Sequence, residues 1–411
     1  MRILVYGLNF YPELTGVGKY TGEMGFWLAK RGYKVRVITS HPYYPKWKSE
    51  IRFHYSKDLI NGVEIFRCPI YVPNKYTGLK RLIHLFSFAI SSFPIILFSI
   101  TWRPTVIWTV APTFFTSPLT LFIAKITNSK TWIHIQDFEL DAAFSLGLIK
   151  SGIYKSIPFY FEKMILKKFD CVSTISSKML RKLHEKGVDE CRTYYFPNWV
   201  DTKKIKPLDS QNEICELKYF KRSIGINDDK KKIVLYSGNL GKKQGVDIIL
   251  EVANIFEKTT DVLFVICGDG VYSREIIKKG SLLKNILMIP PQSDRDFNYL
   301  LNSATAHIVP QLANAADLVL PSKLSGIFAS GKPVLVTADE GTDLYDIVSG
   351  KGIAVRPGLK YDFANNLARL LNNENLCKKL GLSAREFAVE NLDLNKVLHM
   401  FELRLKDLVK C

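Results

Sequence analysis

The chain has 411 residues, of which 47% are hydrophobic and 23% charged, with a formal net charge of +18. This composition is typical of a globular protein, and the length predicts two domains rather than one core. Most of the net charge, +14, lies in residues 1–200, which indicates an anionic partner for that half. Nucleic acid is disfavoured, because no helix-turn-helix, zinc-finger or RNA-recognition pattern occurs.

The cysteines and the N-terminus indicate the compartment. The seven cysteines are odd in number and are never spaced C-x-x-C, so free thiols in a reducing cytosol are the simplest interpretation. The N-terminal apolar run ends before Glu13. This is too short for a signal peptide and fits a first buried strand.

The first half alternates β-branched runs with helical patterns, as a doubly wound parallel sheet does. A glycine turn containing Gly16 and Gly18 follows the first run, and a helix is predicted over residues 19–31. Such a turn is expected in a Rossmann-like domain with or without a ligand. The predicted strands are 3–6, 34–39, 63–70, 106–110, 131–135, 171–175 and 193–196.

Residues 82–100 form an apolar run preceded by Lys80 and Arg81. A membrane-spanning helix needs about 20 apolar residues, so this run is barely long enough to span a membrane. His84, four serines and Pro94 disfavour insertion. A helix lying in the membrane interface is the preferred interpretation, and a buried core helix and a true span stay open.

Acidic side chains follow the predicted strand 131–135. Asp137 comes almost directly after it, and Glu139 and Asp141 are next. Ligands of open α/β sheets bind at the carboxyl ends of the strands, so Asp137 is a candidate functional residue. From the residues alone, a solvated loop is the better interpretation of Glu139 and Asp141.

The second half repeats the alternation after residues 202–232, which carry few apolar residues and are interpreted as linker and domain entry. Residues 361–411 are helical in period, with breaks expected near Asn372 and Asn391. The predicted strands are 233–237, 262–267, 286–289, 306–309, 334–337 and 352–355.

Two segments of the second half have the pattern of a phosphate site. Ser322 is a candidate N-cap, with Lys323 in the first helical turn after the strand 306–309. A helix N-terminus at the carboxyl end of a strand attracts phosphate through its free N–H groups. The loop 238–245 adds Lys242 and Lys243 between glycines, although a solvated turn would show the same residues.

Metal and other cofactor chemistry finds no support in the sequence. There is no H-E-x-x-H and no Cys/His cluster, so no metal and no cofactor are expected. The run Asp294-Arg295-Asp296 is better explained by helix capping than by metal binding. The G-x-S-x-G and Walker patterns of serine hydrolases and P-loop enzymes are also absent.

Several segments together resemble the retaining glycosyltransferases of the GT-B fold, in particular the exopolysaccharide (colanic-acid type) branch of family 4. They are YPELTGVGKYTGEM, FPNWVD, SGNLGKKQGVD and PSKL followed by ASGKPV. The resemblance implies an α/β GT-B architecture of two Rossmann-like domains whose parallel sheets face across a cleft. Residues 1–200 would bind the acceptor and face the membrane, residues 201–390 would bind the nucleotide sugar, and the C-terminal helix 391–411 would pack back on the first domain.

The resemblance also implies the activity and the site. A sugar would pass from a GDP- or UDP-type donor to a polyprenyl-pyrophosphate-linked saccharide, with retention and without a metal. Asp137, Lys243 and Lys323 would be catalytic, and His41, Tyr43, Tyr44 and Glu139 would face the acceptor. The implied donor-binding residues are Gly16, Gly18, Ser237, Gly238, Asn239, Lys242, Gln244, Gly268, Gly270, Pro290, Pro321, Ser322 and Leu324.

The sequence departs from the family pattern at several positions. The two carboxylates of its E-x7-E motif would fall at Leu318 and Gly326, and Asn239 and Gln244 stand where Arg and Lys are usual. A nucleotide-sugar epimerase on the same scaffold, or a non-catalytic polysaccharide-assembly protein, are the alternatives. An anionic membrane surface is the expected partner. The expected location is therefore cytoplasmic, peripheral to the inner face of the plasma membrane.

Overall fold

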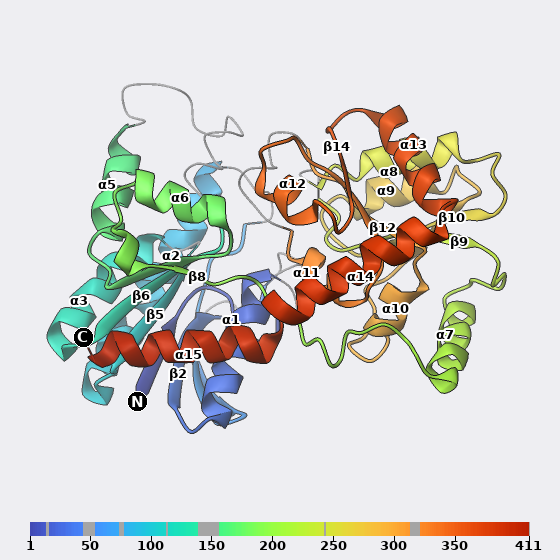
Figure 1. Ribbon diagram of the computed structural model, residues 1–411. Helices are drawn as coiled ribbons and strands as arrows, with labels where there is room; N and C mark the ends of the chain where they lie inside the picture. Colours follow the sequence, from blue (N-terminus) through green and yellow to red (C-terminus); the bar gives the residue numbers. More distant parts are fainter. Residues whose placement is uncertain are drawn as a thin grey trace. The chain divides into compact units, whose positions relative to one another are not determined.

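The computed structural model describes residues 1–13, 16–43, 54–73, 78–111, 114–138, 156–241, 244–312 and 321–410. The chain forms two compact units, each an α/β structure built on its own sheet (Figure 1). The first unit comprises Met1–Pro197 and Leu398–Cys411, and the second comprises Asn198–Val397.

The sheet of the first unit has eight strands in the order β3-β4-β2-β1-β5-β6-β7-β8. Every described pairing is parallel except that of β3 with β4. In chain order the strands are β1 (Arg2–Tyr6), β2 (Lys34–Ser40), β3 (Ser56–Ile60), β4 (Val63–Cys68), β5 (Val106–Ala111), β6 (Lys130–Ile135), β7 (Cys171–Thr174) and β8 (Thr193–Tyr195).

The edge strand β3 was not predicted from the sequence. It pairs antiparallel with β4 across the two-residue turn Asn61-Gly62, and both turn residues have positive φ. Asn-Gly is the strongest short-range signal of a β-hairpin. The strand itself, SKDLI, alternates intermediate and exposed positions and so lacks the buried apolar run that marks the other strands.

Helices cover both faces of the first sheet. On one face α2 and α3 pack over Leu4, Tyr6 and Ile107. Trp108 points to the opposite face, since side chains alternate along a strand, and there it meets Phe401 of α15 at 6.4 Å between ring centroids. The helices are α1 (Gly16–Lys30), α2 (Gly78–Trp102), α3 (Ser117–Thr127), α5 (Ser156–Leu166), α6 (Ser177–Glu185) and α15 (Leu394–Lys410), with a 3-10 turn η1 (Phe114–Thr116).

The C-terminal helix α15 therefore packs on the first unit, as the family resemblance implies. Phe401 stacks on Phe196 at 4.7 Å and meets Trp132 at 4.9 Å. Glu402 is buried and accepts a hydrogen bond of 2.7 Å from the Tyr33 hydroxyl. These contacts attach α15, at the C-terminal end of the chain, to the first unit.

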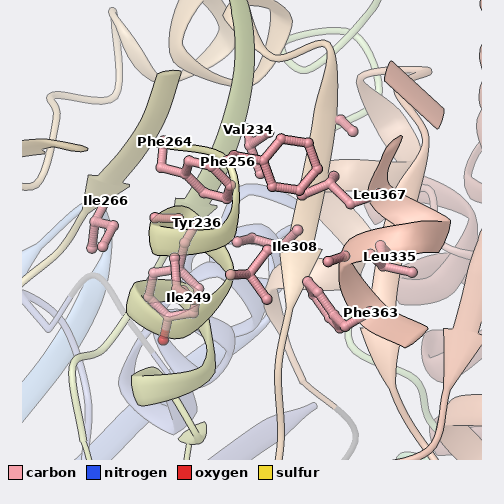
Figure 2. Packing of buried hydrophobic residues seen from close by; sticks show 14 of the residues in the cluster. Val234, Tyr236, Ile249, Phe256, Phe264, Ile266, Ile308, Leu335, Phe363 and Leu367 are labelled. Atoms are coloured by element: carbon pink, nitrogen blue, oxygen red, sulfur yellow. The ribbon is translucent and has the colours of Figure 1, made fainter. Parts of the chain in front are cut away.

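The second unit holds a six-stranded, all-parallel sheet in the order β11-β10-β9-β12-β13-β14. Its core interleaves Tyr236 and Ile308 from the strands with Ile249 of α8 and Phe363 of α13 (Figure 2). The strands are β9 (Lys232–Ser237), β10 (Val262–Cys267), β11 (Ile286–Ile289), β12 (Ala306–Val309), β13 (Val334–Thr337) and β14 (Ile353–Val355).

The helices of the second unit include one that the sequence analysis missed. Residues 202–232 were interpreted as linker, but α7 forms there. Ser210 and Glu213 make a capping box at its start, and Phe220 is buried on its inner side. The helices are α7 (Gln211–Ser223), α8 (Asp247–Ile255), α9 (Ser273–Gly280), α10 (Phe297–Ser303), α11 (Lys323–Ala329), α12 (Asp343–Val348), α13 (Lys360–Leu371) and α14 (Glu374–Asn391).

Candidate functional site

Glycines bring two loops of the second unit into close contact at the carboxyl ends of β9 and β10. Gly238 has φ +150°, which residues with side chains rarely adopt. A Cβ on Gly268 would lie 1.9 Å from the Gly238 carbonyl oxygen, and one on Gly270 would lie 2.4 Å from the Leu240 carbonyl oxygen. Only glycine allows this contact, at the edge where α/β sheets bind ligands.

The backbone N–H groups of this contact are largely used within the protein. Gly238 donates to the Cys267 carbonyl at 2.9 Å, Leu240 to the Asp269 carbonyl at 2.9 Å, and Gly268 to the Ile289 carbonyl at 3.3 Å. An anion bound here would therefore need positive charge from side chains.

Lys323 supplies such a charge. Its Nζ lies 3.9 Å from the centroid of the Tyr236 ring, and a Cβ on Gly238 would meet it at 2.8 Å. The amine is buried and has no hydrogen-bond partner in the part of the chain that the structure describes, although the lysine stem is partly exposed. Burial lowers the pKa of Lys323 to about 7. The Tyr236 hydroxyl is turned away, donating to the Asn239 carbonyl at 2.7 Å.

The start of α11 differs from the predicted capped helix. Ser322 occupies the N-cap position, but its side chain makes no capping hydrogen bond and its backbone is already helical. Pro321 accepts the Leu324 N–H at 3.1 Å. The Leu324 side chain is a buried member of the hydrophobic core, so only the backbone of this predicted donor-binding residue could contact a donor. Leu324 lies on the buried, apolar side of the short helix α11.

Three further predicted donor residues of the second unit, Ser237, Gln244 and Pro290, are described by the structure. Ser237 ends β9 in register with Cys267, and the Gln244 carboxamide oxygen lies 2.5 Å from where a Cβ on Gly241 would stand. The Pro290 carbonyl accepts the Gln292 side-chain N–H at 2.7 Å. Lys242, Lys243 and Leu318 lie outside the described residues.

Gly326, the position of the second family carboxylate, faces α10. A Cβ there would lie 3.5 Å from Leu301 Cδ1 and 3.8 Å from a ring carbon of Phe297. These are ordinary van der Waals contacts with apolar groups. The glycine thus takes part in helix packing, and α11 contains no acidic residue.

In the first unit a buried carboxylate joins three segments at the carboxyl ends of β1 and β2. Glu13 Oε2 accepts the Asn9 side-chain N–H at 2.8 Å, and Glu13 Oε1 accepts the Tyr43 backbone N–H at 3.2 Å. A Cβ on Gly18 would lie 2.7 Å from Glu13 Cβ, so the glycine makes room for the glutamate. Gly16 opens α1 with φ +61°.

Of the predicted acceptor residues, Tyr43 contacts this carboxylate, and His41 lies two residues before Tyr43. The Tyr43 hydroxyl accepts the Asn9 side-chain N–H at 3.2 Å. His41 Nε2 donates to the His54 carbonyl at 2.8 Å, and burial lowers the pKa of His41. The hydrogen bond of His41 therefore ties the segment after β2 to the segment before β3. Tyr44 and Glu139 lie outside the described residues.

Asp137 is half-buried at the carboxyl end of β6, two residues beyond the strand. Phe138 beside it is buried beneath the ammonium groups of Lys182 and Lys186, each 5.2 Å from its ring centroid. On the other side, Gln136 donates to His134 Nε2 at 3.0 Å. Burial lowers the pKa of His134 to about 3, so the imidazole is neutral and serves to fix the end of the strand.

Sequence reasoning missed Tyr236, Asn9 and Glu13. Tyr236 belongs to an apolar strand and had the pattern of core. Glu13 was noted only as the end of the first apolar run. Their roles depend on contacts between residues 4 to 87 positions apart, for which no local spacing gives a signal. Among the described residues, no group of three or more His, Cys, Asp and Glu is placed to hold a metal ion.

The fold and this site define the class. The chain has two α/β units, each built on a mainly or wholly parallel sheet, and the second unit carries a glycine contact and a buried lysine at the edge of its sheet. These features are those of a GT-B fold. The sequence profile of the glycosyl transferases group 1 family matches residues 219–387, and that of the glycosyl transferase 4-like domain matches residues 15–199.

Proteins of similar sequence indicate the same family. The chain is 38% identical over 413 residues to a protein of Escherichia coli strain K12 with the provisional name colanic acid biosynthesis glycosyl transferase WcaI, with 98% of each chain covered. It is 22% identical to the uncharacterized glycosyltransferase MJ1069 of Methanocaldococcus jannaschii, covering 100% of this chain and 99% of that one. The chain belongs to the group 1 (family 4) glycosyltransferases and is a glycosyltransferase.

Solved structures show the same fold at low identity. The sucrose-phosphate synthase of Thermosynechococcus elongatus has a TM-score of 0.77 at 14% identity, with 99% of each chain covered. Anabaena Alr3699/HepE, solved in complex with UDP and glucose, has a TM-score of 0.71 at 13% identity, again with 99% of each chain covered.

Proposed function

We propose that this glycosyltransferase moves a sugar from a nucleoside diphosphate sugar, of UDP or GDP type, to a polyprenyl-pyrophosphate-linked saccharide. The reaction would belong to the assembly of a cell-surface polysaccharide of the colanic-acid kind, on the cytoplasmic face of the plasma membrane. The name of the Escherichia coli relative supports the pathway, and the UDP-glucose complex of Alr3699/HepE supports the donor class.

The observation that carries the donor site is the Lys323 amine. Breaking the bond between sugar and phosphate leaves negative charge on the departing diphosphate, and a preorganised cation at that point lowers the barrier. Lys323 Nζ is buried beside Gly238 without a partner among the described residues. A bound diphosphate would supply the missing counter-charge and restore the protonated amine.

The acceptor side rests on the first unit. Asp137, held between Gln136 and the buried Phe138, would orient or activate the acceptor hydroxyl. His41 and Tyr43 would line its approach. Retention of configuration is implied by the family, with the donor phosphate helping to take the acceptor proton in a front-face transfer.

A donor panel tests the proposal. Purified protein is mixed with UDP-, GDP- and dTDP-sugars, and thermal unfolding is followed, because a ligand that binds only the native state raises the melting temperature. We expect one donor class to stabilise the protein and Lys323→Met to abolish that shift. Lys351→Met is the matched control, since Lys351 also lies over an aromatic ring, 4.8 Å from the Phe387 centroid, and its pKa is also lowered by burial.

Product analysis then separates transfer from the alternatives. We expect release of nucleoside diphosphate to depend on a lipid-linked acceptor and to yield a glycosylated lipid. An epimerised sugar formed without acceptor would instead identify an epimerase. Donor binding that never leads to turnover, with any acceptor tested, would identify a non-catalytic assembly protein. Both matching family profiles describe glycosyl transferases, which favours transfer.

A further inference from the structure

Helix α2 is apolar on two opposite sides. Its inner side, with Leu85, Phe88 and Ile96, is buried in the core of the first unit. Its outer side carries Phe86, Ile90, Phe93 and Phe98, all exposed, with Ile90 at 59% and Phe98 at 58%. The helix is long and apolar enough to span a membrane by length and composition, so the question is what covers its outer side.

Helix α3 continues the exposed apolar face. It packs on the same face of the sheet as α2, and its outward residues Phe122 and Ile126 are half-exposed, at 52% and 50%. Phe115 of η1 bridges the two helices by an edge-to-face contact with Phe86, at 5.9 Å between centroids. We call Phe86, Ile90, Phe93, Phe98, Phe122 and Ile126 together the α2–α3 surface.

The buried side of α2 excludes a membrane span by this helix. Ser92 shares a buried hydrogen bond of 2.6 Å with the Tyr6 hydroxyl in the middle of the sheet. Leu85, Phe88 and Ile96 close the core over Leu4 and Ile107. Inserting α2 across a bilayer would open that core to water, whereas contact with the outer side alone leaves it intact.

The segment that carries this surface has charges of one sign only. Residues 65–136 contain no Asp or Glu, and they contain seven Lys and Arg. Among these, Lys80 and Arg103 are exposed at the two ends of α2, and Lys125 is exposed between Phe122 and Ile126. An apolar face with a basic rim suits the interface of an anionic bilayer, in which side chains enter the acyl boundary and cations meet headgroups.

We propose that the α2–α3 surface docks the first unit on an anionic lipid surface through helices that stay folded on their sheet. The proposal deepens the proposed function, on which it rests for the lipid-linked acceptor. A second copy of the chain is a poorer occupant, because a two-fold interface would place the same basic rim against itself.

Vesicle co-sedimentation of the full chain tests this. Vesicles of phosphatidylcholine alone are compared with vesicles of equal parts phosphatidylcholine and phosphatidylglycerol, over a series of salt concentrations. We expect pelleting with the anionic vesicles only, weakening as salt rises because headgroup attraction is screened. Pelleting that survives high salt and carbonate, or equal pelleting with neutral vesicles, would overturn the proposal.

Two triple variants locate the surface. Phe86→Ser, Ile90→Ser and Phe98→Ser together should lower vesicle partitioning about tenfold or more. Tyr219→Ser, Val271→Ser and Leu282→Ser together change apolar residues of the second unit that are even more exposed, and they should leave vesicle partitioning unchanged. Both must keep wild-type thermal unfolding. Equal loss in both triples, no loss in the first, or a dimer that dissociates in the first instead of a vesicle complex, would show the assignment wrong.

Transfer activity separates this proposal from the proposed function. The first triple variant should bind the nucleotide sugar as the wild type does and should glycosylate a detergent-dispersed acceptor. It should fail only with acceptor in vesicles. Vesicle binding without any transfer would leave the docking surface standing and remove the proposed function. Transfer without vesicle binding would overturn the docking surface and leave the proposed function standing.

Discussion

The ammonium nitrogen of Lys323 lies 3.9 Å from the centroid of the Tyr236 ring, directly over the glycine that follows β9. The aromatic face is an electron-rich surface on which a cation can rest without a carboxylate. A carboxylate at this place would compete with the donor diphosphate. The pairing of a lysine with a ring therefore keeps the charge available for an anionic ligand.

The first prediction concerns pH. Since burial lowers the pKa of Lys323 to about 7, the amine loses its proton as pH rises from 6 to 8. We expect the dissociation constant of the UDP- or GDP-sugar to rise across this range, and binding to take up a proton near pH 7. Calorimetry in buffers of different ionisation heat measures both effects. A pH-independent affinity, with the same heat in every buffer, would contradict the assignment.

The second prediction concerns stability at the same residue. The folded-state pKa of Lys323 lies below its ordinary value of 10.5, so between about pH 7 and 10.5 the folded state binds fewer protons than the unfolded state. The free energy of unfolding should rise with pH in that window because of this group. Lys323→Met should remove this rise and raise the melting temperature at pH 6, while donor binding is lost. A variant destabilised at pH 6 would show that the amine has a structural partner.

The third prediction compares two glycines of the second unit. Gly268→Ala would drive its Cβ to 1.9 Å from a backbone oxygen of Gly238, which no side-chain movement relieves. We expect a loss of about 1–3 kcal/mol of stability together with weaker donor binding. Gly326→Ala is the control, because its Cβ would make ordinary contacts at 3.5 Å and would favour the helix by roughly 1 kcal/mol. Urea unfolding measures both, and equal effects would contradict the loop contact.

The fourth prediction concerns Glu13. Glu13→Ala leaves the Asn9 amide and the Tyr43 N–H buried without their carboxylate partner, which should cost about 1–3 kcal/mol. We expect the KM for the acceptor to rise more than the donor dissociation constant, because Glu13 holds the predicted acceptor residue Tyr43 directly, whereas most of the predicted donor residues lie in the second unit. Glu13→Gln, which keeps one acceptor oxygen, should recover part of the effect. A change confined to donor binding would rule out this positioning role.

The fifth prediction concerns the attachment of α15. Burial would raise the pKa of Glu402, but the hydrogen bonds from Tyr33 and Lys406 and the contact with Arg31 outweigh it and lower the pKa to about 2. The stability that this carboxylate contributes should be complete above about pH 4.5 and be lost as pH falls through about 2. Glu402→Gln should cost about 1.5–3 kcal/mol at pH 7 and show a flatter acid unfolding profile. If the stability of the variant fell with pH as steeply as that of the wild type, this role of Glu402 would be contradicted.

The sequence alone determined the two-domain α/β plan. β-branched runs separated by helical patterns predict parallel sheets, because burial on both faces demands continuous apolar strands. Of the fourteen strands within the described residues, thirteen follow from that rule. Breaks near Asn372 and Asn391 were predicted correctly as well, and the boundaries of α13, α14 and α15 lie there. The PSKL motif and the sequence of the glycine loop were sufficient to indicate the family and to make Lys323 a candidate site residue.

The tertiary structure decided what the chosen residues do. Tyr236 beneath Lys323, and Glu13 beside Gly18 and Tyr43, are contacts between segments that local pattern does not connect. The same holds for α2, for which the sequence favours the membrane interface but leaves a core helix and a span open. Only packing against Tyr6 and Ile107 separates its buried side from its exposed side. Local propensity fixes an element and its period, but the partner of each side chain depends on which distant strand the sheet order places beneath it.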